Sequence, residues 1–282
     1  MDSEDEIFRK NLEETLPLGR GVRVLAANAV GIFALEKPAG TQTHPNAPGI
    51  AAAKNALLVA DYSLKAECYF CRVAGGKIQK VFILNRLDAP TSGVVLAATD
   101  EKIAAAARRA FLGGNVYKVY VAAVCGNVIP EKGIWRDFLR RVRTRDGSLR
   151  VEIARGNSRD ALFSETYYSV MKSGTLGGGE HPVPVALLRL EPKTGRTHQL
   201  RVQCATRKFP ILGDKTYGDF HRNAKLGEAG ARLFLHAEET AITFPWRGKK
   251  VEFSAKSPLP PAFPSLLVVP CDASTKKCTE GR

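Results

Sequence analysis

The sequence predicts an α+β protein in which strands predominate and a few helices are inserted between them. Most of its apolar segments are short and rich in β-branched or aromatic residues, whereas Ala-rich or clearly capped helical segments occur at few places. In addition, 44% of the 282 residues are hydrophobic. That fraction is sufficient for the core of one large domain or of two modest lobes that share a sheet.

The first third of the chain alternates between strand and turn patterns. Residues 22–35 contain two β-prone stretches, and residues 36–40 (EKPAG) break the pattern as a turn. Residues 49–61 are Ala-rich, and their larger apolar side chains recur near the helical period. This pattern predicts a helix over residues 49–61.

The next segment carries an acid and a base between two apolar strands. A strand at residues 81–84 runs into a turn that contains Arg86 and Asp88, and another apolar strand follows at once. A carboxylate in such surroundings loses hydration, and it stays charged only if a cation or several hydrogen-bond donors replace the lost water. Asp88 therefore indicates either a site of chemistry or a structural ion pair, with Arg86 as one candidate donor.

The elements that follow are predicted from helix signals and from apolar runs. A helix is expected at residues 100–111, with Asp100 as its cap and Gly113 and Gly114 as its stop. Strands are expected at residues 116–125, 150–153, 163–171 and 185–190, a short helix at 197–207, and a final strand pair at 233–244 and 250–253.

The polar side chains of the predicted helix at 197–207 are notable. His198 and Arg201 are three positions apart and lie on neighbouring parts of one helix face, while Arg196 is next to the helix start. No repeat or low-complexity linker divides the chain. We expect an N-terminal extension at residues 1–21, one catalytic domain at 22–256, and a Pro-rich packed extension with a polar tail at 257–282.

The charge indicates a polyanionic partner. Lys and Arg number 42 against 28 acidic residues, which gives a formal net charge of +14. Such an excess costs self-repulsion and is typical of proteins that bind nucleic acid or, less often, an acidic membrane surface. No apolar run approaches the length of a membrane span, so we expect no membrane partner.

The cysteines predict reduced thiols and a cytoplasmic location. Nothing at the acidic N-terminus resembles a secretory signal. Cys68 and Cys71 have the spacing of half a zinc site, but no second pair and no nearby histidine complete it. We therefore expect no metal. The six cysteines are Cys68, Cys71, Cys125, Cys204, Cys271 and Cys278.

Several separated segments together resemble one family, the RluA-type pseudouridine synthases. The motifs that carry the resemblance, in chain order, are 36–40 (EKPAG), 85–93 (NRLDAPTSG), 117–122 (YKVYVA), 194–201 (TGRTHQLR), 210–214 (PILGD) with 217–218 (YG), and 233–237 (LFLHA). Because these segments occur in register from about residue 22 to 255, the resemblance is far more specific than one short motif.

The resemblance implies a fold, an activity and site residues. The fold is a mixed, largely antiparallel central sheet in two lobes with a cleft between them. The activity is isomerisation of uridine to pseudouridine in structured ribosomal or transfer RNA, without metal, nucleotide or other cofactor. Asp88 matches the catalytic aspartate, Tyr120 the aromatic residue that stacks on the base, and Arg201 the cation paired with the carboxylate. Arg86 matches an arginine that holds the target nucleotide out of its helix.

Three further residues of these motifs, Thr91, Arg196 and His198, are assigned to substrate binding. Two positions depart from the family pattern, because Asn85 stands where the signature more often has histidine and Gln203 replaces a frequent histidine after the third motif. Neither position is assigned to bond-making chemistry. The departures therefore affect target choice and positioning more than activity.

RNA contact is expected beyond the cleft. Residues 136–159 are rich in arginine and contain few acids, which is typical of a mobile basic hairpin or loop. Guanidinium groups bind phosphate bidentately and stack on unpaired bases, so this segment is a candidate clamp on RNA. Within it we assign Arg140, Arg141, Arg143 and Arg145 to RNA binding; a solvated arginine-rich face is the alternative.

Other interpretations of these residues stay open at this stage. Asp88 could belong to a structural ion pair, Tyr120 could be a core aromatic, Arg201 a surface residue and His198 a structural histidine. The protein could accordingly be a catalytically silent RNA-binding or ribosome-assembly protein on the same scaffold, or a general basic nucleic-acid-binding protein. The leading hypothesis is a monomeric pseudouridine synthase, since a retired scaffold has no need for a desolvated acid.

Overall fold

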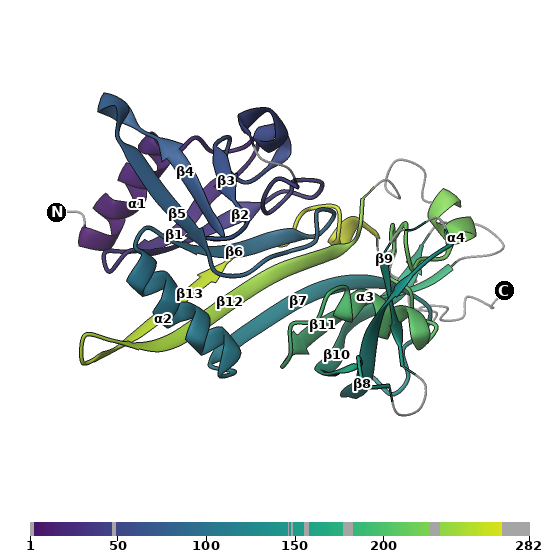
Figure 1. The fold of residues 1–282 in the computed structure, drawn as a ribbon. Helices are drawn as coiled ribbons and strands as arrows, with labels where there is room; N and C mark the ends of the chain where they lie inside the picture. The colour runs from purple at the N-terminus through teal and green to yellow at the C-terminus, as the bar shows by residue number, and fades with distance from the viewer. Residues whose placement is uncertain are drawn as a thin grey trace, which may run out of the picture.

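A computed structural model describes residues 3–46, 49–145, 147, 149–154, 158–176, 183–225 and 232–266 of the chain. One 13-stranded sheet runs through the molecule, with its main strands in the order β3-β4-β5-β6-β12-β7-β11-β10-β8-β9 (Figure 1). Its strand pairs are antiparallel, apart from a short parallel contact between β6 and β12. The predicted α+β class with a mixed, largely antiparallel sheet is confirmed.

The strands have the following bounds: β1 Arg23–Asn28, β2 Ile32–Lys37, β3 Asp61–Ser63, β4 Cys68–Arg72, β5 Ile78–Ile83, β6 Ser92–Ala98, β7 Val116–Cys125, β8 Lys132–Arg143, β9 Leu149–Ile153, β10 Leu162–Leu176, β11 Val183–Pro192, β12 Leu235–Trp246 and β13 Lys249–Lys256. The helices are α1 Glu4–Thr15, α2 Glu101–Leu112, α3 Gln199–Thr206 and α4 Phe220–Lys225, with short 3-10 turns at Ile50–Asn55, Ala74–Gly76 and Pro264–Leu266.

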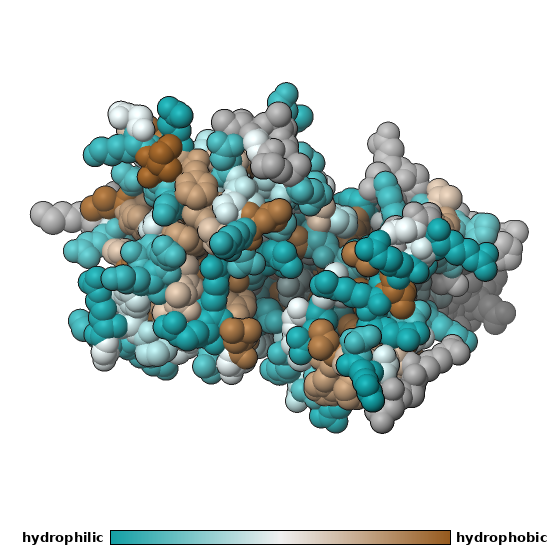
Figure 2. Space-filling model, in the orientation of Figure 1, coloured by the Kyte–Doolittle hydropathy of each residue, from teal (hydrophilic) through white to brown (hydrophobic). Residues whose placement is uncertain are grey.

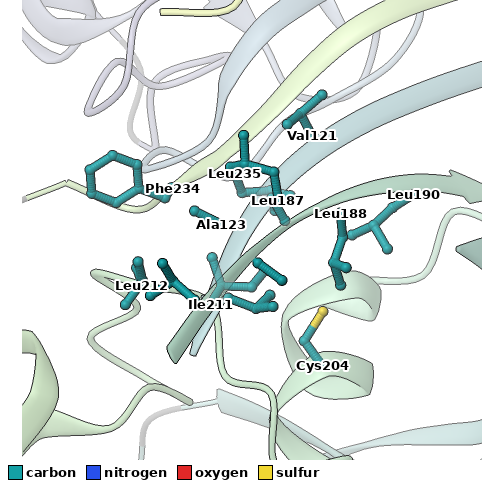
Figure 3. Close-up of a cluster of buried hydrophobic side chains, with 14 of the residues drawn as sticks. Val121, Ala123, Leu187, Leu188, Leu190, Cys204, Ile211, Leu212, Phe234 and Leu235 are labelled. Carbon is teal, nitrogen blue, oxygen red and sulfur yellow. The ribbon is translucent and has the colours of Figure 1, made fainter. Parts of the chain in front are cut away.

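The strands form two lobes that are joined by the long strands β7 and β12 (Figure 1). One lobe contains β1 to β6 with α1, α2 and β13, and the other contains β8 to β11 with α3 and α4. The first lobe has two buried apolar clusters. The second lobe has a core built from β7, β11, α3 and the segment 211–212, in which Val121, Leu188 and Cys204 are buried (Figure 3). Each lobe therefore has its own core, while the sheet is shared.

The lobes are held together where β6 meets β12. Ser92 lies opposite His236 and Gly93 opposite Ala237 in this parallel contact. A Cβ atom at Gly93 would lie 2.1 Å from the carbonyl oxygen of Ala237, and the φ angle of Gly93 is +117°. Only glycine permits this approach. The turn that precedes β6 is thereby brought beside β7 of the shared sheet.

Helix α2 matches its sequence signals. The side chain of Asp100 accepts hydrogen bonds from the backbone N–H groups of Lys102 and Ile103, and Gly113 terminates the helix. Such a cap contributes about 1 kcal/mol. The apolar face of α2 buries Ile103, Ala104 and Ala107 against the sheet. The predictions of this helix, of β7, and of the strands at 150–153, 163–171, 185–190, 233–244 and 250–253 are confirmed.

The predicted helix at residues 49–61 is wrong. Only Ile50–Asn55 forms a 3-10 turn, and β3 begins at Asp61. The chain after Asn55 is extended because its backbone pairs with other segments: the N–H of Leu57 donates to Gln42, and the N–H of Gly19 donates to Leu57. Successive residues there are also buried, so these apolar side chains fill the core from several sides rather than forming one helix face. Tertiary pairing has overridden the helix propensity of alanine.

The two ends of the described chain pack onto the lobes. Helix α1 was not predicted; it begins after the Ser3 cap and buries Leu12, and Leu16 beyond its end, in the core beneath β1 and β2. Near the other end, Phe263 and Leu266 are buried in the core of the second lobe. Residues 267–282 lie outside the described residues. The domain boundaries proposed from the sequence stay a prediction.

The arginine-rich segment forms a hairpin. Strands β8 and β9 pair in antiparallel register, with Arg140 opposite Glu152 and Arg143 opposite Leu149. The expectation of a hairpin is therefore confirmed over these strands. Arg155 and Gly156, which belong to the same segment, lie outside the described residues. The prediction that the hairpin is mobile stays a prediction.

The buried cysteines explain why their spacing does not make a zinc site. Cys68 and Cys71 are both on β4, and their side chains belong to the two apolar clusters on opposite faces of the sheet. Two sulfur atoms on opposite faces cannot bind one ion.

Hydrophilic side chains cover most of the face in Figure 2. Each helix of the described residues is too short or too polar to cross a bilayer.

Candidate active site

Asp88 lies in the turn between β5 and β6, and the backbone of this turn is fixed at several points. The N–H of Thr91 donates to the carbonyl oxygen of Asp88 at 3.0 Å, and the N–H of Gly40 donates to that of Ala89 at 2.8 Å. The side-chain hydroxyl of Thr43 donates to the carbonyl of Leu87 at 2.8 Å and accepts from its N–H at 3.1 Å. The side chain of Asp88 is 28% exposed, so its carboxylate is neither sealed in the core nor free in solvent.

Lys37 holds this turn from beneath. Its side chain is fully buried, and its Nζ donates to the carbonyl oxygens of Pro38, Thr41 and Ala89 at 3.1, 2.6 and 2.9 Å. Burial lowers the pKa of Lys37 to about 7, and the negative charge of Asp88 opposes this shift. The three donors of an ammonium group thus each have a backbone acceptor. Lys37 therefore fixes the backbone of this turn.

Arg201 reaches Asp88 from α3. One of its terminal nitrogens donates to Asp88 Oδ2 at 3.0 Å, while Nε and the other terminal nitrogen donate to the two carboxylate oxygens of Asp214 at 2.8 and 2.9 Å. Burial disfavours the charge of Arg201, but its interactions with Asp214 and Asp88 outweigh burial and raise its pKa. The guanidinium is therefore permanently charged and held in one orientation.

Asp214 is the anchor of this arrangement. It is 1% exposed, and its Oδ1 also accepts from the backbone N–H groups of Thr216 and Tyr217. Burial would raise the pKa of Asp214, but the hydrogen bonds and charge of Arg201, together with those two N–H groups, hold the pKa below its usual value. Arg201 and Asp214 form the buried ion pair. The third nitrogen of the guanidinium donates its hydrogen bond to Asp88.

His198 is the second polar neighbour of Asp88. Its Nε2 lies 3.6 Å from Asp88 Oδ2, and its Nδ1 lies 2.9 Å from the hydroxyl oxygen of Tyr217. His198 precedes α3 in the left-handed conformation, with φ of 54°, which is uncommon for a residue other than glycine. Burial lowers the pKa of His198, although the charge of Asp88 opposes this. The imidazole is therefore mainly neutral at neutral pH.

Tyr120, Asp88 and Arg201 line one small pocket of about 110 Å³. Tyr120 projects from β7, and its pKa is raised by burial and by the charge of Asp88, so it stays a neutral phenol. Arg86, Thr91, Arg196 and His198 line the same pocket. The structure therefore brings together all seven residues that the sequence assigned to catalysis and substrate binding, from positions more than 100 residues apart in the chain.

The surroundings of the substrate-binding candidates differ. The exposed Arg86 and Arg196 lie at the pocket rim, and Arg196 is steadied by a 3.0 Å bond from its Nε to the carbonyl of Phe163. Thr91 is 2% exposed and forms part of the pocket wall. The four hairpin arginines do not line the pocket. Of these, Arg141 donates at 2.8 Å to the hydroxyl of Thr197, which lies between the pocket residues Arg196 and His198.

The comparison with known proteins identifies the family. The sequence profile described as RNA pseudouridylate synthase matches residues 31–206, more than half of the chain. The chain belongs to the RNA pseudouridylate synthase family. It is an RNA-modifying isomerase, and the resemblance seen in the sequence is confirmed.

Individual relatives of this synthase agree. A "tRNA pseudouridine synthase C" of Vibrio vulnificus is 33% identical over 187 residues, which cover 63% of this chain and 73% of that protein. An "Uncharacterized RNA pseudouridine synthase" of Zymomonas mobilis is 33% identical over 211 residues, covering 74% and 86% of the two chains.

Solved structures show the same fold. Human RNA Pseudouridylate Synthase Domain Containing 1 superposes with a TM-score of 0.63 at 24% identity over 87% of this chain and 86% of that chain. The corresponding Domain Containing 4 protein has a TM-score of 0.60 at 24% identity, covering 91% and 93%. The predicted pseudouridine synthase fold is confirmed.

The two departures from the family pattern have structural roles in this synthase. Asn85 accepts a 2.7 Å hydrogen bond from the N–H of Leu96 and so ties the turn that contains Asp88 to β6. Gln203 is fully buried, donates to Asp137 on β8 at 2.7 Å and accepts from Thr166 on β10 at 2.7 Å. Both side chains thus fix elements that carry the pocket, and neither lines it.

Three residues of the synthase were missed as members of the site. Asp214 and Tyr217 were recognised only as parts of a motif, although they orient Arg201 and His198; the Tyr217 ring also lies 5.3 Å from the Arg201 guanidinium. Lys118 projects into the pocket two residues before Tyr120 and donates to the carbonyl of Thr194 at 3.1 Å. The alternation along β7 could have revealed it, since positions 118 and 120 share one face.

Proposed function

We propose that this synthase isomerises uridine in transfer RNA, with Asp88 as the catalytic carboxylate. The observation that carries the assignment is that Asp88, 28% exposed, receives one hydrogen bond from the fixed Arg201 and lines a pocket together with Tyr120. A carboxylate held in this manner can act as a nucleophile or as a base. The named relatives that act on transfer RNA support the choice of substrate.

The reaction requires that uracil leave C1′ of its ribose, turn over while held, and rejoin the same carbon through C5. The proton on C5 is then lost and the former glycosidic nitrogen gains one, so atoms balance without any oxidant or cofactor. Asp88 can attack the ribose or the base, or it can remove a proton from the ribose. In each case the carboxylate must face the everted nucleoside, and the neutral ring of Tyr120 offers a surface on which uracil stacks.

We assign Arg86, Thr91, Arg196 and His198 to substrate binding in the same pocket. Arg86 and Arg196 at the rim are suited to the phosphates on either side of the everted uridine, because guanidinium groups bind phosphate bidentately. Lys118 extends this set. Its neighbours Arg196 and Lys193 are also cationic, and no carboxylate among the described residues pairs with it. An RNA phosphate would compensate this concentration of positive charge.

The β8–β9 hairpin is proposed as an RNA clamp beside the pocket. Arg141, Arg143 and Arg145 are exposed, whereas Arg140 pairs with Glu152 through bonds of 2.8 and 2.6 Å. The hydrogen bond from Arg141 to Thr197, which lies between the pocket residues Arg196 and His198, supports a clamp next to this pocket. We also propose a monomer in the cytoplasm; the four described cysteines form no disulfide with one another, which is typical of a reducing compartment.

Pseudouridine mapping tests the proposal. Purified wild-type protein and the Asp88→Asn variant are each incubated with total RNA, and pseudouridine is mapped by carbodiimide-blocked reverse transcription. We expect new stops in transfer RNA with the wild type and none with Asp88→Asn, while both proteins bind RNA with similar affinity. Asp61→Asn, at an exposed position on β3, is the matched control and retains full activity.

Two outcomes would contradict the proposal. An Asp88→Asn variant as active as the wild type would remove the carboxylate from the mechanism. New stops confined to ribosomal RNA would identify ribosomal RNA, rather than transfer RNA, as the substrate. The proposed role of Asp88 in the reaction would then stand. The catalytically silent scaffold is not favoured by the family comparison, and the absence of any product from the wild-type protein would revive it.

A further inference from the structure

A larger cavity adjoins the catalytic pocket and shares part of its wall. Its volume is about 650 Å³, compared with about 110 Å³ for the pocket that contains Asp88 and Tyr120. The residues on the common border of the two spaces are Arg86, Leu87, Asp88, Lys118, Tyr120, Gly195 and Arg196. A volume of this size lies in the range that binds a whole small-molecule ligand. The everted uracil does not account for it.

A stack of aromatic rings forms one wall of this cavity. The imidazole of His44 lies parallel to the ring of Tyr62, with centroids 5.0 Å apart and an interplanar angle of 5°. Tyr62 in turn packs edge-on against Tyr69 at 4.6 Å. Tyr62 and Tyr69 are buried, whereas His44 is only partly buried and lines the cavity. Tyr62 covers one face of the imidazole, so a ligand ring in the cavity would have to stack on the opposite face.

The stack is rigidly connected to the catalytic turn. Tyr69 donates from its hydroxyl to the carbonyl of Thr43 at 2.8 Å, and Thr43 exchanges two hydrogen bonds with Leu87. His44 follows Thr43 directly, and Asp88 follows Leu87 directly. The distance between the imidazole and the catalytic carboxylate is thus set by two short backbone connections. A ligand that occupies both spaces would therefore need a matching distance between the group at Asp88 and the ring at His44.

The charges of the cavity define the chemistry of that ligand. Arg86 and Lys118 lie on the border with the catalytic pocket, and neither pairs with a carboxylate among the described residues. Besides Asp88, which is held by Arg201, the cavity wall contains the acid Glu67, and its carboxylate lies 3.4 Å from Arg108. The ligand should therefore carry a negative group near the catalytic pocket and a flat ring near His44. A nucleotide joined to the target uridine through its phosphate has this arrangement.

We propose that this cavity is a second nucleotide subsite, in which the base next to the target uridine stacks on His44. This inference rests on the proposed function, because it takes the catalytic pocket as the site of the everted uridine. The subsite restricts the synthase to uridines whose neighbour can also leave the RNA stack. Such uridines occur in loops and at helix ends rather than within regular helices.

Binding measurements test the subsite without relying on turnover. The protein is the Asp88→Asn variant, and the RNA is a short labelled stem-loop that carries the mapped uridine. Each nucleotide that flanks the uridine is replaced in turn by an abasic one. His44→Ala and His44→Asn remove the ring, His44→Phe retains a ring, and His221→Ala on α4 is the matched control. Fluorescence anisotropy gives Kd for each combination.

We expect His44→Ala and one of the abasic replacements each to weaken binding about 5- to 100-fold, as expected for the loss of a stacked base. Together they should weaken it no further than either alone. His44→Phe and His221→Ala should stay within about threefold of the parent protein. His44→Asn should behave as His44→Ala, and retained binding in His44→Phe would show that the loss follows the ring rather than a folding defect.

The subsite is refuted if the two losses multiply, if no flanking base affects Kd, or if His44→Phe is as weak as His44→Ala. Failure of the proposed function has a different signature. Turnover of the same stem-loop by the otherwise wild-type enzyme is measured in parallel, so a failed function gives no pseudouridine in any RNA. A failed subsite gives an active enzyme whose binding ignores His44.

Discussion

Arg201 and Asp88 are 113 positions apart in the chain, and their side chains meet at 3.0 Å. The guanidinium cannot turn away, because two of its nitrogens are bound to the buried Asp214. It therefore anchors Oδ2 of Asp88, while Oδ1 accepts no hydrogen bond from a described residue. A carboxylate with one fixed and one available oxygen keeps its orientation and can still react.

The variant Asp214→Asn should lose both stability and activity. It leaves the guanidinium of Arg201 buried without its bidentate partner, and breaking a buried pair costs about 3–5 kcal/mol. Asp88 should also lose its fixed orientation. We expect a lower free energy of unfolding in urea and a reduced kcat. The control is Glu152→Gln, which breaks the exposed Arg140–Glu152 pair and should cost at most about 1 kcal/mol. Equal costs for the two variants would contradict the anchor role of Asp214.

The pH dependence of substrate capture should report Lys118. Burial, together with the charges of Arg196 and Lys193, lowers its pKa to about 8 in the free enzyme. Lys118 is charged below this pH and loses its proton above it, so its attraction for RNA phosphate falls as pH rises. We expect kcat/KM to decline between about pH 7 and 9. In Lys118→Met, kcat/KM should be lower throughout and flat over the same range. If kcat/KM of Lys118→Met declined over the same pH range, a group other than Lys118 would be responsible for the decline.

The hydroxyl of Tyr217 should matter more than its ring. It accepts from the N–H of Val151 at 2.9 Å and orients His198 at 2.9 Å. Tyr217→Phe retains the ring beneath Arg201 but leaves the Val151 N–H without this partner. We expect a loss of about 1–2 kcal/mol in the free energy of unfolding. Activity should fall about 10-fold because His198 is released. Tyr167→Phe, at a partly exposed position of β10, should change neither quantity, and a silent Tyr217→Phe would remove Tyr217 from the site.

The hairpin arginines should appear in the salt dependence of RNA binding. Replacing Arg143 and Arg145 with Gln removes two exposed charges from the proposed clamp. We expect the slope of log Kd against log salt concentration to fall by about 0.7–0.9 for each arginine that contacts a phosphate. Lys249→Gln with Lys250→Gln removes the same charge from the distant β12–β13 hairpin (Figure 1). If both double variants shift the slope equally, the effect comes from net charge rather than from a clamp.

Elements specified by local signals could be predicted from the sequence, whereas elements that depend on distant partners could not. Helix α2 could be predicted because Asp100, the apolar spacing and Gly113 all act within one or two turns. Helix α1 could also have been found, since the Ser3 hydroxyl accepts from Glu6, and Phe8, Leu12 and Leu16 recur at four-residue spacing. The error at residues 49–61 has the opposite origin. The alanines favour a helix locally, but backbone partners near Pro17 and Gln42 hold the segment extended.

The family, most strands and seven residues around the pocket could be predicted from the sequence alone, because motifs and periodicity involve neighbouring positions. That Asp214 fixes Arg201, that Lys118 shares the pocket with Tyr120, and that a second cavity opens beside His44 is visible only in the folded chain. These relationships depend on which distant segments touch where β6 meets β12. A contact between side chains far apart in the chain leaves no periodic trace in the sequence, since its energy arises only after the chain has folded.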